Sequence, residues 1–143
     1  MPLEKYRILI ADDSEDDRLL LMRGLRKVAC CEVIACVEDG QMAIDYLTGS
    51  TPYDDRARFP MPDVLLLDLK MPRVNGFDVL LWLTDQTFPG LQVIVLSSSY
   101  LPEDIAKTLT MGADHYLIKG EPAKTAESIE SFLRSSAMAA RPA

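Results

Sequence analysis

Short runs of apolar residues alternate along this chain with longer stretches in which apolar residues recur every three or four positions. The short runs are rich in valine, isoleucine and leucine, which is typical of strands buried on both faces of a sheet. They predict five strands, at residues 6–11, 32–37, 63–68, 91–96 and 114–118. The periodic stretches predict five helices, at residues 14–28, 43–47, 76–86, 102–112 and 123–135. This alternation indicates an α/β fold with a parallel sheet and helices on both faces.

Two segments lack any periodicity. Residues 49–62 are rich in proline, aspartate and arginine, so we expect an exposed loop. Residues 136–143 are small and polar and are expected to fray. The length of the chain suits one domain over residues 1–143, with its core between about residues 6 and 135.

The composition excludes several classes of protein. A formal net charge of −7 argues against direct binding of nucleic acid, which depends on neutralising phosphates. The chain has neither an apolar run long enough to span a membrane nor a signal-peptide core at its start. Cys30, Cys31 and Cys36 lack metal-ligand spacing, so we expect idle thiols in a reducing cytoplasm.

Polar side chains stand where four of the predicted strands end: Asp12 and Asp13, Asp68, Ser97 and Lys119. In a parallel sheet these ends open on one edge, where open α/β sheets bind ligands. Taken singly, each residue also has a purely structural explanation, as a helix cap, a loop cap, a loop hydroxyl or a solvated charge. Their joint placement at one edge favours a functional site.

Carboxylates that converge at such an edge repel one another unless a cation joins them. Oxygen ligands of high charge density suit Mg²⁺, which keeps several waters and often bridges to phosphate. A lysine and a hydroxyl at the same place would hydrogen-bond the oxygens of a phosphoryl group and offset its charge. Aspartate is a known covalent acceptor of phosphoryl groups. The pattern therefore predicts that Asp68 becomes an aspartyl phosphate.

The chain from about Tyr6 to Leu133 resembles the receiver domain of two-component response regulators. The motifs that carry the resemblance are Asp12-Asp13, Asp68 followed by Met71-Pro72 and Gly76, Ser97 after an apolar strand, and Tyr116 with Lys119. The resemblance implies a flavodoxin-like, doubly wound (βα)5 fold whose five parallel strands lie in the order 2-1-3-4-5. The loop from Tyr53 to Pro62 resembles that of single-domain regulators encoded beside phytochrome-type histidine kinases.

The resemblance also implies how the acidic residues act. Asp68 would accept phosphate from the phosphohistidine of a sensor histidine kinase. Asp13 and Asp68 would ligate Mg²⁺ directly, together with the main-chain carbonyl of Lys70. Asp12 would act largely through a bound water.

The remaining site residues would respond to the phosphoryl group. Ser97 would move to bond one phosphoryl oxygen, and Lys119 would pair with another. Tyr116 would turn inward behind Ser97 and alter the surface formed by the fourth helix, the fifth strand and the fifth helix. In such a change, the added charge of the phosphoryl group would shift the receiver from one conformation of this surface to another.

Three positions depart from the family pattern. Ser97 stands where the family usually has threonine, and Lys70 places a positive charge two residues after the phosphoacceptor. Gly120 follows Lys119 where the family usually has a proline after a cis bond. A non-proline cis bond costs roughly 2.5–4 kcal/mol, so we predict a trans Lys119–Gly120 bond. Because glycine reaches positive φ at little cost, Gly120 is expected to absorb the turn.

We therefore expect a stand-alone receiver with no output domain after Leu133, which acts by binding an output protein. An aspartyl-nucleophile phosphatase is one alternative, although such enzymes typically place a second acid where Lys70 stands. A receiver-like module that binds partners without phosphate is the other.

The third predicted helix is apolar on more than one face. Leu81 and Trp82 lie outside the inward-facing stripe that we expect Phe77, Leu80 and Thr84 to form. Neighbouring side chains could partly cover the two extra residues. Alternatively, these residues form a contact patch for a partner or for a second copy of the chain, as in a homodimer.

Overall fold

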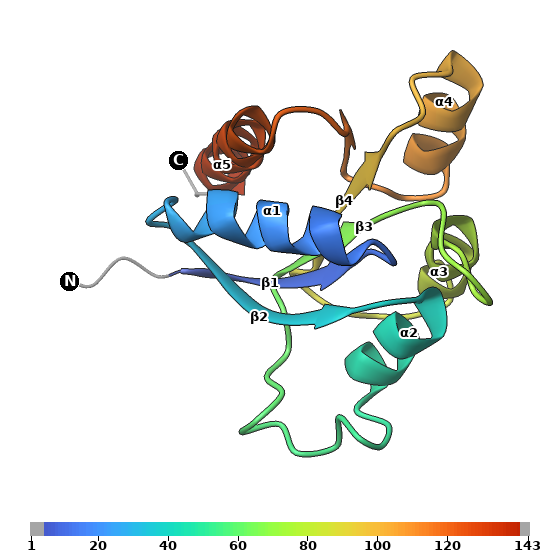
Figure 1. Ribbon diagram of the computed structural model, residues 1–143. Helices are drawn as coiled ribbons and strands as arrows, with labels where there is room; N and C mark the ends of the chain where they lie inside the picture. The colour runs from blue at the N-terminus through green and yellow to red at the C-terminus, as the bar shows by residue number, and fades with distance from the viewer. Residues whose placement is uncertain (1–4, 141–143) are drawn as a thin grey trace.

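The computed structural model describes residues 5–140, with side chains up to residue 136. Within these residues five strands form one parallel sheet in the order β2-β1-β3-β4-β5, with helices on both faces (Figure 1). The strands are β1 (Tyr6–Ala11), β2 (Cys31–Val37), β3 (Val64–Leu67), β4 (Gln92–Ser97) and β5 (His115–Ile118). The helices are α1 (Glu15–Arg26), α2 (Gly40–Thr48), α3 (Gly76–Leu83), α4 (Pro102–Thr110) and α5 (Pro122–Ala140). The predicted fold class and strand order are confirmed.

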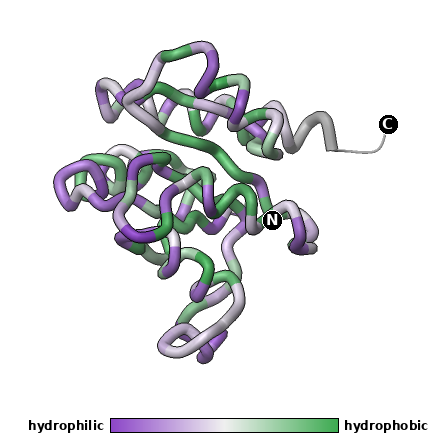
Figure 2. Tube along the Cα trace, turned by 90° about the vertical axis from the view of Figure 1, so that its right-hand side faces the viewer, coloured by the Kyte–Doolittle hydropathy of each residue, from purple (hydrophilic) through white to green (hydrophobic). Residues whose placement is uncertain are grey.

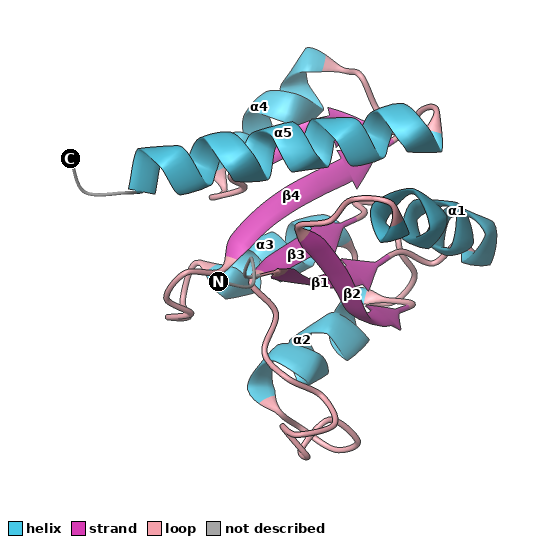
Figure 3. Ribbon diagram, turned by 90° about the vertical axis from the view of Figure 1, so that its left-hand side faces the viewer, coloured by secondary structure: helices cyan, strands magenta, loops and turns pink. Residues whose placement is uncertain are grey.

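The central strand, β3, has apolar neighbours on both faces. All four of its residues are at most 1% exposed. Leu65 and Leu67 pack into a cluster with residues of α2 and α3, whereas Val64 and Leu66 pack into a cluster with residues of α1 and α5. Helices α1 and α5 lie on one face of the sheet and α2 on the other (Figure 3). Because side chains alternate across a strand, a strand covered on both faces is apolar at every position. Apolar residues accordingly follow the strands through the interior of the molecule (Figure 2).

Side-chain caps fix where three helices begin, on the edge of the sheet that carries the carboxyl ends of the strands. The Ser14 hydroxyl accepts a hydrogen bond of 3.2 Å from the main-chain N–H of Asp17 at the start of α1. The Asp39 carboxylate accepts one of 2.8 Å from the N–H of Met42 and caps α2. Asn75 forms a capping box at the start of α3. Each cap satisfies an N–H group that has no partner within its helix.

The loop of residues 49–62 contains no helix or strand, as predicted, but it is folded against α2 and only partly exposed. The rings of Tyr53 and Phe59 pack against the buried Tyr46 of α2, with centroid separations of 5.0 and 6.0 Å. The Arg56 guanidinium donates to two main-chain carbonyls in the last turn of α2, at 2.8 and 3.0 Å. The loop thereby caps the carboxyl end of α2, which its irregular sequence did not indicate.

Helix α5 extends further than the sequence predicted. It continues to Ala140, so residues 136–140 are helical and do not form a frayed tail. Residues 141–143 of the expected tail lie outside the described part of the chain. Alanine and methionine, which fill all four positions 137–140, are strong helix formers and explain the extension.

Helix α3 presents one large apolar side chain to solvent. Leu81 is 62% exposed, whereas Trp82 is half-buried and packs against Phe88, with ring centroids 5.9 Å apart. The predicted inward stripe is wrong at Thr84, which is exposed, and Val79 takes its place in the core. Neighbouring side chains thus cover Trp82 in part and leave Leu81 uncovered.

The three cysteines are free thiols, two of them buried and one half-buried. Burial raises the pKa of Cys31 to about 12 and also raises the pKa of Cys36. Both thiols are therefore un-ionised at neutral pH, and thiols that are not ionised react slowly. Within the described residues, no helix has the length and apolar character needed to cross a membrane.

Candidate functional site

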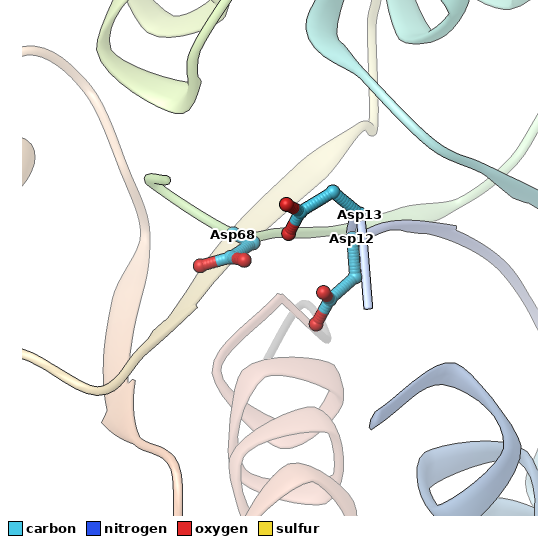
Figure 4. A group of neighbouring side chains, drawn as sticks. All are labelled: Asp12, Asp13 and Asp68. Atoms are coloured by element: carbon cyan, nitrogen blue, oxygen red, sulfur yellow. The ribbon is translucent and has the colours of Figure 1, made fainter. Parts of the chain in front are cut away.

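Three carboxylates meet at the edge of the sheet where β1 and β3 end. Asp12 and Asp13 follow β1 and Asp68 follows β3, and one oxygen of each lies within 4.8 Å of the others (Figure 4). The main-chain N–H groups of Asp12 and Asp68 continue the strand ladders, donating to the carbonyls of Val37 at 3.1 Å and Ala11 at 2.9 Å. These bonds fix the backbone from which the side chains project. The sheet itself therefore builds the acidic cluster.

The acidic cluster is enclosed on one side and open on the other. Asp12 is 3% exposed and Asp68 is 5% exposed, whereas Asp13 is exposed to solvent. The acidic cluster therefore reaches the surface of the molecule at Asp13. Three carboxylates offer only hard oxygen donors, which is the ligand chemistry that Mg²⁺ and similar divalent cations prefer.

The ammonium of Lys119, directly after β5, lies among three carboxylates. Its Nζ atom is 2.8 Å from Asp12 Oδ2, 2.9 Å from Asp17 Oδ2 and 3.2 Å from Asp68 Oδ2. The lysine therefore offsets part of the repulsion between the buried acids. The structure brings together the predicted residues Asp12, Asp68 and Lys119. It adds Asp17, a residue of the first turn of α1 that the sequence pattern did not indicate as part of the site.

Burial dominates the ionisation of Asp68. Loss of hydration raises the pKa of its carboxyl, the charge of Lys119 lowers it and the charge of Asp12 raises it, with a net rise to about 6. For Lys119, burial lowers the pKa, but hydrogen bonds to Asp12 and Asp17 and the charge of Asp68 raise it above its ordinary range. The two results are compatible because one ammonium is shared by three carboxylates. The lysine is stabilised by all three, whereas Asp68 receives only part of its charge.

Asp68→Asn is expected to raise the free energy of unfolding at neutral pH without divalent cations. The increase is at most about 2 to 3 kcal/mol, since one pKa unit corresponds to about 1.4 kcal/mol. The folded-state pKa lies above the unfolded value, so ionised Asp68 destabilises the fold, and this cost is relieved as the pH falls from about 6 toward 3.8. Urea unfolding of both proteins should show a gap that narrows on acidification. Equal stabilities at neutral pH would contradict the expectation.

Ser97 and Tyr116 are linked through the backbone of Ser99. Ser97 is 1% exposed, and its hydroxyl accepts a hydrogen bond from the Ser99 N–H at 3.2 Å. The Tyr116 hydroxyl donates to the Ser99 carbonyl at 2.7 Å, and its ring is half-buried. Among the described residues, the Ser97 hydroxyl makes no hydrogen bond to Asp68. The serine and the tyrosine are therefore both hydrogen-bonded to the same residue of the loop between β4 and α4.

The loop between β3 and α3 approaches the site through its backbone. The Lys70 N–H lies 3.4 Å from Asp68 Oδ1, and the Lys70 side chain is exposed. Arg73 adopts a φ of 63° and donates a 2.6 Å hydrogen bond to Asp39, whose side chain is almost fully buried. This ion pair between the loop and the cap of α2 joins segments distant in the sequence, and no sequence pattern indicated it.

The bond between Lys119 and Gly120 is trans, as predicted, because within the described residues a cis bond occurs only at Thr51–Pro52. The prediction of a positive φ at Gly120 is wrong, because the φ of this glycine does not lie in the left-handed region. The Lys119 N–H still bonds to the carbonyl of Ser97 at 2.8 Å, and α5 begins only at Pro122. Two residues are thus available for the turn, so the backbone needs no left-handed residue there.

A comparison with known protein families agrees with this fold. The response regulator receiver domain matches the chain over residues 8–130. The chain belongs to the response regulator receiver family. Response regulator Rcp1 of Synechocystis is 27% identical to this receiver over 130 residues, which cover 87% of this chain and 86% of Rcp1. The Mn(2+)-bound crystal structure of Rcp1 matches with a TM-score of 0.77 and 29% identity, covering 90% of this chain and 94% of that chain.

Two further relatives differ in how much of their length the receiver covers. The phosphorylated cyanobacterial phytochrome response regulator RcpA matches with a TM-score of 0.80 and 28% identity, covering 92% of this chain and 96% of that chain. A protein-glutamate methylesterase/protein-glutamine glutaminase of Trichodesmium erythraeum is 30% identical over 136 residues, 92% of this chain. This receiver spans only 35% of that relative. The match therefore concerns the receiver part and does not carry over the whole relative's activity.

Proposed function

We propose that this receiver is a phosphorylation-dependent signalling switch in which Asp68 accepts a phosphoryl group from the phosphohistidine of a sensor histidine kinase. The observation that carries the proposal is the meeting of Asp68 with two further carboxylates and Lys119 on a side that is open at Asp13. A carboxylate oxygen of Asp68 forms the new bond to phosphorus. The P–N bond of the phosphohistidine breaks, and its electron pair returns to the imidazole.

A divalent cation, which we propose to be Mg²⁺, would supply the positive charge that offsets the phosphoryl oxygens. The carboxylates of Asp13 and Asp68 would hold it together with the main-chain carbonyl of Lys70, and Asp12 would act through a bound water. The all-oxygen donor set supports this choice. The description of the Rcp1 structure as Mn(2+)-bound supports a divalent cation in a related receiver.

Lys119 and Ser97 would hold the phosphoryl oxygens. The lysine already donates to Asp68 Oδ2 at 3.2 Å. If the Ser97 hydroxyl turned toward the phosphoryl group, it would release the N–H of Ser99 and free the loop before α4 to move. Tyr116 is bonded to that loop through its hydroxyl, so the surface of α4, β5 and α5 would change with it. The charge of the phosphoryl group would thus shift this surface between two conformations.

The proposed kinase is of the phytochrome type, an inference supported by the likeness to RcpA, which is named a phytochrome response regulator. The proposed output is the binding of a protein partner, or of a second copy of the chain, by the altered surface. The net charge of −7 disfavours direct contact with nucleic acid phosphates.

Incubation with acetyl phosphate and Mg²⁺ is expected to add one phosphoryl group, which intact-protein mass spectrometry detects. A chelator should suppress the labelling. Asp13→Ala should weaken Mg²⁺ binding and slow the labelling, because the variant lacks an exposed oxygen ligand. Asp16→Ala, which removes an exposed carboxylate three residues along, is the matched control. Absence of labelling in the wild-type protein would contradict the proposal. Labelling by a phytochrome-type kinase, and not by unrelated kinases, tests the proposed partner.

A further inference from the structure

The ammonium of Lys119 has three N–H donors, and three carboxylates surround it. Two of them, Asp12 and Asp68, belong to the acidic cluster in which one oxygen of each residue lies within 4.8 Å of the others. The third, Asp17, stands outside that cluster, and its Oδ2 atom is 2.9 Å from the ammonium. Asp17 therefore binds the lysine from the side of α1, away from the proposed cation.

Asp17 is well placed to hold the lysine in a fixed position. Its main-chain N–H donates to the Ser14 hydroxyl, and the Ser14 N–H donates to Asp12 Oδ1 at 2.9 Å, which ties the first turn of α1 to the residue that follows β1. Its side chain is 44% exposed, compared with 4% for Asp12 and 7% for Asp68. The Asp17 carboxylate thus remains partly hydrated, and the lysine can bind it without further burial of charge.

The buried carboxylates of Asp12 and Asp68 are needed both by Lys119 and by the proposed cation and phosphoryl group. The ammonium occupies a lone pair on Oδ2 of both Asp12 and Asp68, and its positive charge repels a nearby cation, so these oxygens are weaker ligands and weaker nucleophiles while Lys119 holds them. A shift of Lys119 away from these oxygens would favour the proposed reaction, provided that the ammonium stays beside the phosphoryl group. A carboxylate outside the cluster allows both, because the ammonium keeps one ion pair while its other two donors are redirected.

We propose that Asp17 is a positioning residue for Lys119: it holds the ammonium on the α1 side of the site, so that the oxygens of Asp12 and Asp68 become available to the divalent cation and the phosphoryl group. The inference rests on the proposed function. It deepens that function, since it assigns a role in cation binding to a residue outside the acidic cluster.

The test compares the Mg²⁺ affinity of the intact chain with that of Asp17→Asn, by following backbone amide signals in NMR titrations with MgCl₂. Without Asp17 the carboxylate partners that remain to the ammonium among the described residues are Asp12 and Asp68, so Mg²⁺ must compete more strongly for their oxygens. We expect the affinity to fall about two- to fivefold, the range for a partly exposed ion pair. Asp17→Glu, which keeps the charge, should restore most of the affinity.

Asp16→Asn is the matched control, because Asp16 lies in the same first turn of α1, is exposed and carries the same charge. It reports the general effect of removing a negative charge near the site and near the start of the helix. A drop in affinity of the same size in Asp16→Asn and Asp17→Asn, or tighter binding in Asp17→Asn, would overturn the inference.

A double-mutant cycle with Lys119→Met tests whether Asp17 acts through the lysine. In the Lys119→Met background, Asp17→Asn should lower the Mg²⁺ affinity no more than Asp16→Asn does. A full loss in that background would mean that Asp17 acts on the cation directly and would also overturn the inference. If the wild-type protein fails to bind Mg²⁺ or to label with acetyl phosphate, the proposed function fails instead, so the two failures are distinguishable.

Discussion

Asp68→Asn is expected to abolish phosphoryl labelling by acetyl phosphate and Mg²⁺. The amide lacks the anionic oxygen that forms the bond to phosphorus, and the neighbouring carboxylates cannot replace it. Asp12 is buried and paired with Lys119 at 2.8 Å, and Asp13 projects from the neighbouring strand end toward solvent. Intact-mass measurement after incubation should find the added phosphoryl group in the wild-type protein and none in the variant.

Loss of labelling in this variant has a clear meaning only if its fold is intact. The stability predicted for Asp68→Asn is at least that of the wild-type protein, so urea unfolding supplies the check. Asp63→Asn is a matched control, because Asp63 precedes the same strand at its other end and bonds to the N–H of Arg7 at 2.8 Å. It should label normally. Labelling that persists in Asp68→Asn would refute the assignment of the phosphoacceptor.

Gly76→Ala is expected to lower the free energy of unfolding by about 2 to 3 kcal/mol, the upper part of the range for overpacking. A Cβ atom at Gly76 would lie 2.3 Å from the carbonyl oxygen of Asp68 and 2.7 Å from the Cα of Leu69. Both contacts are with backbone, which cannot rotate away as a flexible side chain can. The intrinsic preference of alanine for helices, about 1 kcal/mol over glycine, offsets only part of this cost.

The same substitution should also slow phosphoryl labelling, because relief of the clash displaces the backbone at Asp68. Urea unfolding and the rate of labelling by acetyl phosphate measure the two effects. Gly120→Ala is the control, since its Cβ would meet no atom within 4 Å and its φ is not left-handed. Its stability should stay within about 0.5 kcal/mol of the wild type, as for most surface substitutions. A Gly76→Ala protein of wild-type stability would contradict the close approach of the two segments.

The alternation of strands and helices could be predicted from the sequence, because burial determines which positions of a strand or helix are apolar. β3 is buried on both faces, so the sequence from Val64 to Leu67 is apolar at every position. The meeting of Asp12, Asp68 and Lys119 was also readable, because strands that are all parallel end at the same edge. Residue type and place in a strand were sufficient for these predictions.

Other features depend on contacts between segments that no local pattern records. The loop of residues 49–62 packs against α2 through Arg56 and two aromatic rings, yet its composition is that of an exposed loop. Gly120 needed no positive φ because the turn before α5 is spread over two residues. In both cases the surrounding chain determines the conformation of a segment whose own sequence permits several.

The sequence alone therefore determined the order of the elements and the edge at which the acidic residues gather, because periodicity and strand direction follow from local chemistry and chain order. Only the tertiary structure decided which side chains contact one another at that edge. The contact of Asp17 with Lys119, at 2.9 Å, joins the first turn of α1 to the residue after β5. Such a contact depends on how far two elements approach after the core has packed, a distance that neither element encodes by itself.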